Sequence, residues 1–215
     1  MDWEFVVHHL ISGIIPAIAA LILYFAILYL IGRKQATGHI IASFVLVIYF
    51  IGLLTVTGIC IRASSYSPRF SFIPFVDMIR GPVDTALNVL LFMPLGFFLP
   101  LLYEKYDTLR KIALVGFLVS LSVEIIQMFG FGATDINDLI TNTIGACLGY
   151  GIFKILIKIV PKSWVKQIRV EGSQCYYELL IFWICSVLIM LTIQPPIYKA
   201  LFAAGIGSGE MQVWQ

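Results

Sequence analysis

The segment ATDINDLITNT, residues 133–143, places acidic and amide side chains next to one another in a strongly apolar chain. Asp135, Asp138 and Asn142 have the i, i+3, i+7 spacing that puts side chains on one face of a helix. Carboxylates on such a face can act as general acid and base, or provide oxygen ligands for Mg²⁺ or Ca²⁺. Asp135 also fits the first turn of a helix capped by Thr134. Capping does not explain Asp138 and Asn142, so we interpret these two as site residues.

A second set of polar residues lies in the apolar run IALVGFLVSLSVEIIQMFGF, where Glu124 is the one ionisable side chain. Gln127 lies three residues further on and shares its helical face. A charge near the middle of a bilayer costs about 3 kcal/mol or more, so Glu124 should face the interior of a helix bundle. Glu124 and Asp138 are therefore the candidates for catalysis or for metal binding. The alternative is that Glu124 only joins helices through a hydrogen bond.

The segment between the second and third apolar runs supplies opposite charge through Arg62 and Arg69. An arginine fork binds phosphate or carboxylate in a bidentate way, so we expect these side chains to bind an anionic group. Arg62, at the end of its apolar run, has a second interpretation, which is snorkelling to the membrane interface. Asn88 at the start of the third run either caps that helix or faces the same cavity. These residues predict a polar cavity that opens toward the outer leaflet.

The amino-acid composition indicates which kind of fold must position these side chains. Hydrophobic residues make up 60% of the chain and charged residues 12%, whereas an ordinary soluble domain has roughly 25% charged residues. These values predict an all-α, polytopic membrane protein. The net charge of +2 does not indicate nucleic-acid binding.

Apolar runs of about 17–25 residues are long enough to cross the hydrocarbon core as helices. The third run contains Pro94, Gly96 and Pro100, which predict a kinked helix packed within the protein. The connection before it mixes arginines with aromatic residues and prolines, which predicts a partly re-entrant loop. About six transmembrane helices are predicted, at residues 10–31, 40–61, 87–103, 112–131, 138–160 and 179–198.

Basic residues indicate how the helices cross the membrane. Ten of the 14 lysines and arginines fall in the first, third and fifth connections and their flanking turns. Because basic loops face the cytoplasm, both termini and the second and fourth connections are predicted to lie outside the cell. The polar site would then face the extracytoplasmic side.

Three motifs together resemble the VanZ family of bacterial membrane proteins: RFSFIPF (69–75), NVLLFMPLGFFLP (88–100) and SLSVEIIQMFGFGATDINDLITNTIGACLGY (120–150). The resemblance implies a bacterial cell-membrane protein that contributes to glycopeptide resistance, particularly to teicoplanin, or to envelope maintenance. Many relatives carry an arginine before the aspartate pair, where this chain has Ala133 and Thr134. The motif positions carried over are Arg69, Pro74, Phe75, Asn88, Pro94, Gly96, Glu124, Gln127, Asp135, Asp138, Asn142 and Gly145.

The resemblance divides the chain into three parts. Residues 40–160 form the VanZ-like four-helix core, and residues 1–39 add an N-terminal transmembrane helix. Residues 161–215 hold a cytoplasmic loop, the sixth helix and a tail. Membrane lipids or a lipid-linked envelope precursor are the expected partners.

Three functions remain open at this point. The first is an outward-facing pocket that binds an anionic lipid head group or a lipid-linked cell-wall precursor. The second is a membrane-embedded enzyme that modifies an envelope lipid, with Glu124 and Asp138 as acid and base or as Mg²⁺ or Ca²⁺ ligands. The third is a lipid translocator. No cofactor is firmly implied. The expected ligand-binding residues are Arg62, Arg69, Asn88, Glu124, Gln127, Asp135, Asp138 and Asn142.

Overall fold

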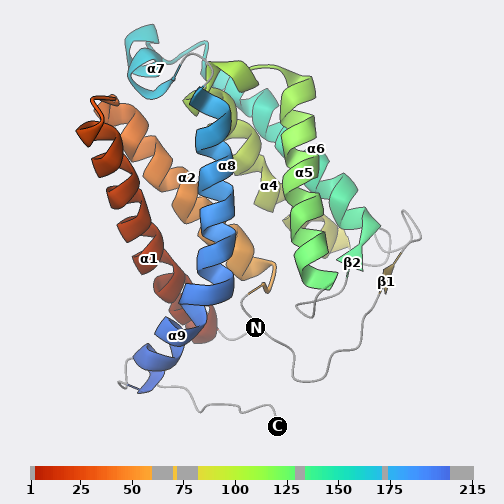
Figure 1. The fold of residues 1–215 in the computed structure, drawn as a ribbon. Helices are drawn as coiled ribbons and strands as arrows, with labels where there is room; N and C mark the ends of the chain where they lie inside the picture. Colours follow the sequence, from red (N-terminus) through yellow and green to blue (C-terminus); the bar gives the residue numbers. More distant parts are fainter. Residues whose placement is uncertain (1–2, 60–69, 72–81, 129–133, 171–173, 204–215) are drawn as a thin grey trace.

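The computed structural model describes residues 3–59, 70–71, 82–128, 134–170 and 174–203 of the 215-residue chain. These residues form a bundle of long helices (Figure 1). Two short helical elements, η1 (Glu104–Tyr106) and α7 (Lys162–Ile168), lie in connections at one end. The long elements are α1 (Trp3–Leu30), α2 (Thr37–Val56), α4 (Pro82–Leu102), α5 (Leu109–Met128), α6 (Ile136–Leu156) and α8 (Gln174–Leu188), the last continued by η2 (Ile189–Ile193) and α9 (Gln194–Ala203).

The helices form two groups. In one group α6 packs against α4 and α5, and in the other α1 packs against α2 and α9. Helix α2 joins its own group to the other because it also contacts α4. Helix α8 packs against α2 as well. Large apolar side chains that are fully buried at this junction, such as Phe50 and Phe92, fill the centre of the bundle.

Among the described residues five helical segments are long and apolar enough to cross a membrane, which confirms an all-α membrane fold in outline. They are Val6–Leu30, Thr37–Val56, Pro82–Leu102, Ile136–Leu156 and Tyr177–Ala203. Helix α5 is 20 residues long but is not among these segments, so the sixth predicted span stays a prediction.

Several details of the helices differ from the sequence-based expectation. Helix α4 begins at Pro82, five residues before the predicted start, because proline is well suited to the first position of a helix. The helix continues through Pro94 and Pro100 to Leu102, and the predicted kink stays a prediction. The predicted re-entrant loop falls mostly on residues outside the described ranges. Only β1 (Phe70–Ser71) is described there, and it pairs in parallel with β2 (Thr134–Asp135).

The connections separate into two ends of the bundle (Figure 1). One end holds the α1–α2 turn, the α4–α5 connection and α7, and the other holds β1, β2 and α9. All ten basic residues that were expected to share a side lie in the segments at the α7 end. The side of the membrane that this end faces, and with it the predicted orientation of the helices, stays a prediction.

Helices α4 and α6 pack with their backbones in contact. A Cβ added at Gly145 would overlap the backbone carbonyl of Val89, and one at Gly149 would overlap the carbonyl of Met93. Glycines four residues apart, as at Gly145 and Gly149, let two membrane helices approach this closely. The close approach also brings the polar side chains of the two helices within hydrogen-bond distance.

Candidate functional site

The outer layer of the site joins α4 to α6. The Asn88 side chain donates a hydrogen bond from Nδ2 to Asp138 Oδ1 at 2.6 Å, and both side chains are half-buried. Because α4 begins at Pro82, Asn88 lies well inside the helix and does not cap it. Of the two interpretations of Asn88, the structure therefore favours the one in which it faces the site.

The inner layer joins α6 to α5. Asn142 Nδ2 donates a hydrogen bond to Ser120 Oγ at 2.9 Å, and the two side chains are 4% and 0% exposed. Glu124, also 4% exposed, lies one turn beyond Ser120 on α5, and Asp138 lies one turn before Asn142 on α6. The two helices run in opposite directions (Figure 1), so Glu124 and Asp138 occupy the same level, nearer the β1–β2 end.

One atom of this site is a buried acceptor without a donor. Asn142 Oδ1 has no hydrogen-bond partner among the described residues, although the side chain is almost fully buried. A buried polar atom that stays unpaired costs about 1–3 kcal/mol. A hydroxyl or N–H group on a ligand could satisfy this acceptor.

The two-residue sheet brings a distant segment to the same end. Phe70 pairs with Thr134 and Ser71 pairs with Asp135, so β1 lies beside the start of α6. The second and fourth connections of the predicted topology are therefore joined at the level of the backbone. Because β2 contains Thr134, the predicted N-cap at this residue is wrong, and Asp135 directly precedes the first helical residue, Ile136.

Comparison with known proteins identifies the protein family to which the chain belongs. A sequence model of the VanZ/LLP1 family matches residues 21–157, which is more than half of the chain. This chain belongs to the VanZ/LLP1 family. It is 45% identical over 67 residues to Protein VanZ of Enterococcus faecium. The predicted resemblance is thus confirmed.

The two comparisons differ in how much they cover. The alignment with Protein VanZ spans 31% of this chain and 41% of that relative, so the chain matches less than half of the relative's length. The VanZ/LLP1 match spans α2, α4, α5 and α6 together with part of α1. No solved structure matches the chain. All site residues described above fall inside the family match.

The remaining residues that were predicted for this site either contact another part of the chain or have side chains that the structure does not describe. Gln127 Nε2 donates a hydrogen bond to the Thr57 carbonyl at 2.9 Å, which satisfies a backbone acceptor at the C-terminal end of α2. Arg62 and Arg69 lie outside the described residues, and for Asp135 only the backbone is described. The binding roles of these residues stay predictions.

Sequence reasoning overlooked Ser120 because an isolated serine in an apolar helix carries little signal. The spacing of Ser120 and Glu124, four residues apart on α5, was the available indication. Among the described residues no group of three or more histidine, cysteine, aspartate and glutamate side chains forms a metal site. Binding of Mg²⁺ or Ca²⁺ at Glu124 and Asp138 stays a prediction.

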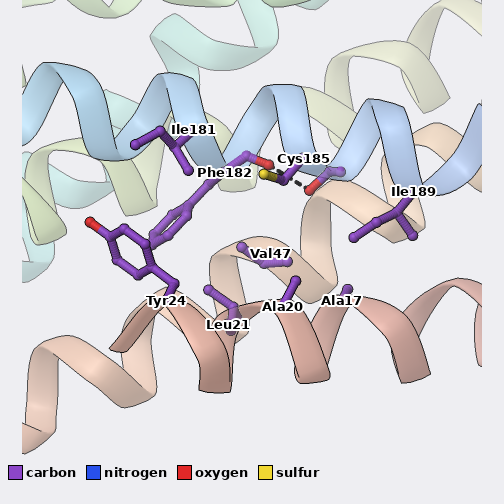
Figure 2. Close-up of a pocket in the computed structure, with 10 residues that line it drawn as sticks. Ala17, Ala20, Leu21, Tyr24, Val47, Ile181, Phe182, Cys185 and Ile189 are labelled. Atoms are coloured by element: carbon purple, nitrogen blue, oxygen red, sulfur yellow. Dashed lines mark hydrogen bonds between the residues drawn. The ribbon is translucent and has the colours of Figure 1, made fainter. Parts of the chain in front are cut away.

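An apolar crevice lies elsewhere in the bundle, between α1, α2 and α8 (Figure 2). Its walls include Leu21, Val47 and Ile189, and its volume of about 30 Å³ is too small for a lipid head group. The hydroxyl of Ser186 is used internally, since it donates to the Phe182 carbonyl at 2.7 Å. The crevice contains none of the predicted site residues.

A second buried polar cluster, which the sequence did not predict, lies near the α7 end. His39 on α2 and Glu178 on α8 are 1% and 5% exposed, and His39 Nε2 lies 3.1 Å from Glu178 Oε2. His39 Nδ1 lies 2.9 Å from the Ile168 carbonyl, and Tyr24 donates to Glu178 Oε1 at 3.3 Å. Both His39 and Glu178 stand at the start of apolar runs in the sequence, so each looked like a boundary residue.

The cluster joins three parts of the bundle. His39 Nδ1 lies beside the Ile168 carbonyl at the end of α7, and His39 Nε2 lies beside Glu178 on α8. Ser43 Oγ, one turn further along α2, lies 3.4 Å from the same Nε2 atom. The buried imidazole and carboxyl groups therefore have polar partners within the bundle.

Proposed function

We propose that this VanZ-family chain is a membrane protein that contributes to resistance against teicoplanin and related glycopeptides. In this proposal the polar site between α4, α5 and α6 opens to the extracytoplasmic side. It binds the head group of an anionic lipid or of a lipid-linked cell-wall precursor, and so reduces the access of the antibiotic to its target.

One observation carries the proposal. Five polar side chains from three helices are linked by hydrogen bonds or lie one helical turn apart inside the family-matched region. They are Asn88, Ser120, Glu124, Asp138 and Asn142. Polar residues in membrane helices are costly and face functional interiors or one another.

The chemistry of the described groups favours a ligand rich in hydrogen-bond donors. Asn142 Oδ1 has no partner among the described residues, and carboxylates accept hydrogen bonds from hydroxyl and amide groups. The carbohydrate and peptide portions of an envelope precursor offer such donors. Its phosphate would be held by Arg69 or Arg62, because β1 begins directly after Arg69 and pairs beside α6.

Resistance measurements with matched carboxyl variants test this proposal. The chain is expressed in a teicoplanin-sensitive Gram-positive host, and the minimal inhibitory concentration of teicoplanin is compared for wild type, Asp138→Asn and Glu124→Gln. Losing a hydrogen bond to a charged group should weaken ligand binding about tenfold or more. We therefore expect both variants to lower the inhibitory concentration toward that of the empty vector.

The matched control is Glu104→Gln, which changes an exposed glutamate at the opposite end of the bundle. It should leave the inhibitory concentration at the wild-type value. Immunoblots of the membrane fraction must show equal amounts of all proteins. Full protection by well-expressed Asp138→Asn and Glu124→Gln would refute the proposal. Complete loss with Glu124→Gln alone would instead indicate the enzyme.

A further inference from the structure

A separate cavity lies at the turn between α1 and α2, at the α7 end of the bundle and away from the proposed resistance site. Its volume is about 170 Å³. The lining combines aromatic and aliphatic side chains with two basic residues and an amide. The residues are Phe25, Tyr29, Arg33, Lys34, Gln35 and Ile40.

The position of this α1–α2 cavity matches the boundary of a membrane. The spanning segment of α1 ends at Leu30 and that of α2 begins at Thr37, so Arg33 and Lys34 lie between the two spans. Phe25 and Ile40 belong to the spanning segments and form the apolar part of the wall. The cavity therefore has a basic mouth above an apolar interior, which is the arrangement of a phospholipid's phosphate above its glycerol and acyl chains.

Backbone hydrogen bonds fix the basic mouth in place. The Arg33 N–H donates to the Leu28 carbonyl at 2.8 Å, and the Gly32 N–H donates to the Tyr29 carbonyl at 3.0 Å. This pair of bonds, with Gly32 at φ 80°, is the Schellman arrangement that ends many helices. The chain after α1 is thus held in a defined turn, so Arg33 leaves the helix at a fixed point.

Arg33 and Lys34 are also free of compensating charge within the described part of the chain. Neither forms a salt bridge there, and Lys34 Nζ lies 6.0 Å from the centre of the Tyr29 ring. The first turn of α2 contains no acidic residue, so no carboxylate within that turn offsets the positive N-terminus of this helix.

We propose that the α1–α2 cavity binds the phosphate of an anionic membrane phospholipid in the leaflet at the α7 end of the bundle. Arg33 and Lys34 contact the phosphate, Gln35 offers a hydrogen bond, and Tyr29 and Phe25 pack against the glycerol and the first acyl carbons. Basic residues near an anionic membrane surface attract it electrostatically. The cavity adds a defined binding position for one lipid.

Lipid titration of the purified full chain tests the proposal. Delipidated protein in detergent is titrated with phosphatidylglycerol or phosphatidylcholine, and native mass spectrometry counts the lipid bound. Wild type should retain one phosphatidylglycerol with saturable affinity and should bind phosphatidylcholine far more weakly. The variant Arg33→Gln/Lys34→Gln should bind phosphatidylglycerol roughly 10- to 30-fold more weakly, because two basic contacts are lost.

Two further variants distinguish binding of one lipid in the cavity from non-specific electrostatic attraction of anionic lipid. Lys158→Gln/Lys162→Gln removes two exposed lysines at the same end that do not line the cavity, and should keep wild-type affinity. Arg33→Lys/Lys34→Arg keeps the charge and should stay close to wild type. Thermal unfolding in detergent should be unchanged for all variants, since the substituted residues are exposed.

Three results would overturn the proposal. One is equal binding of phosphatidylglycerol and phosphatidylcholine by the wild type. Another is the same loss of affinity in both glutamine double variants, because that loss would reflect net charge alone. The third is competition by inorganic phosphate at the concentration at which phosphatidylglycerol binds, which would assign the cavity to a soluble anion. The cavity shares no residue with the proposed resistance site, so failure here leaves the proposed function untouched.

Discussion

Gly149→Ala should lower the free energy of unfolding by about 3 kcal/mol or more, and should leave little folded protein in the membrane. A Cβ at this position would overlap the Met93 carbonyl on α4. The obstacle is backbone and not a flexible side chain, so α4 and α6 would have to move apart. That movement would also break the Asn88–Asp138 hydrogen bond across the same helix pair. The free energy is measured by SDS-induced unfolding of purified protein.

Gly151→Ala is the matched control for this prediction. Gly151 lies on the same helix, two residues further on, and a Cβ added there meets nothing within 4 Å. Alanine favours a helix over glycine by up to about 1 kcal/mol, so this variant should be neutral or slightly stabilised. If Gly149→Ala unfolds at the same SDS concentration as Gly151→Ala, the close packing of α4 and α6 is wrong.

Glu178→Ala should lower the free energy of unfolding by about 3–5 kcal/mol, because removing one member of a buried pair leaves the other without its partner. His39 is 1% exposed and would lose its Nε2 hydrogen bond in an apolar surrounding. Tyr24 would lose the acceptor for its hydroxyl as well. Unfolding in SDS again gives the measurement, and Glu104→Ala, at an exposed acid, should change little.

A double variant separates the pair from other effects of the substitution. His39→Leu/Glu178→Leu removes both polar partners and keeps apolar volume, so it should be less destabilised than Glu178→Leu alone. If the double variant loses as much free energy of unfolding as the two single variants added together, His39 and Glu178 do not interact.

The local part of the candidate site could be predicted from the sequence. The i, i+4 spacing of Asp138 and Asn142 put both on one face of α6, and they contact the neighbouring helices α4 and α5 from that face. Burial of Glu124 was predicted from the cost of exposing a carboxylate to lipid, and the side chain is buried. Each of these inferences uses residues close in the sequence, and helical periodicity is sufficient for them.

Helix boundaries and short strand pairings were harder to predict from the sequence. The start of α4 at Pro82 was missed because residues 82–86, PVDTA, are not strongly apolar, although proline there is an N-terminal signal. The pairing of β1 with β2 joins residues 64 positions apart in a two-residue sheet, for which no periodicity exists to detect. The predicted Thr134 cap was wrong for the same reason, because the residue takes part in that pairing.

By itself the sequence determined the membrane class, the family and the polar face of α6, since composition, motif and periodicity are properties of local stretches of chain. Only the tertiary structure decided which side chains meet. Asn88 meets Asp138 across 50 residues, Ser120 meets Asn142 across 22, and His39 meets Glu178 across 139. These pairs depend on how each helix is rotated and which helix packs beside it. In this chain glycines decide part of that packing, because they let the α4 and α6 backbones touch.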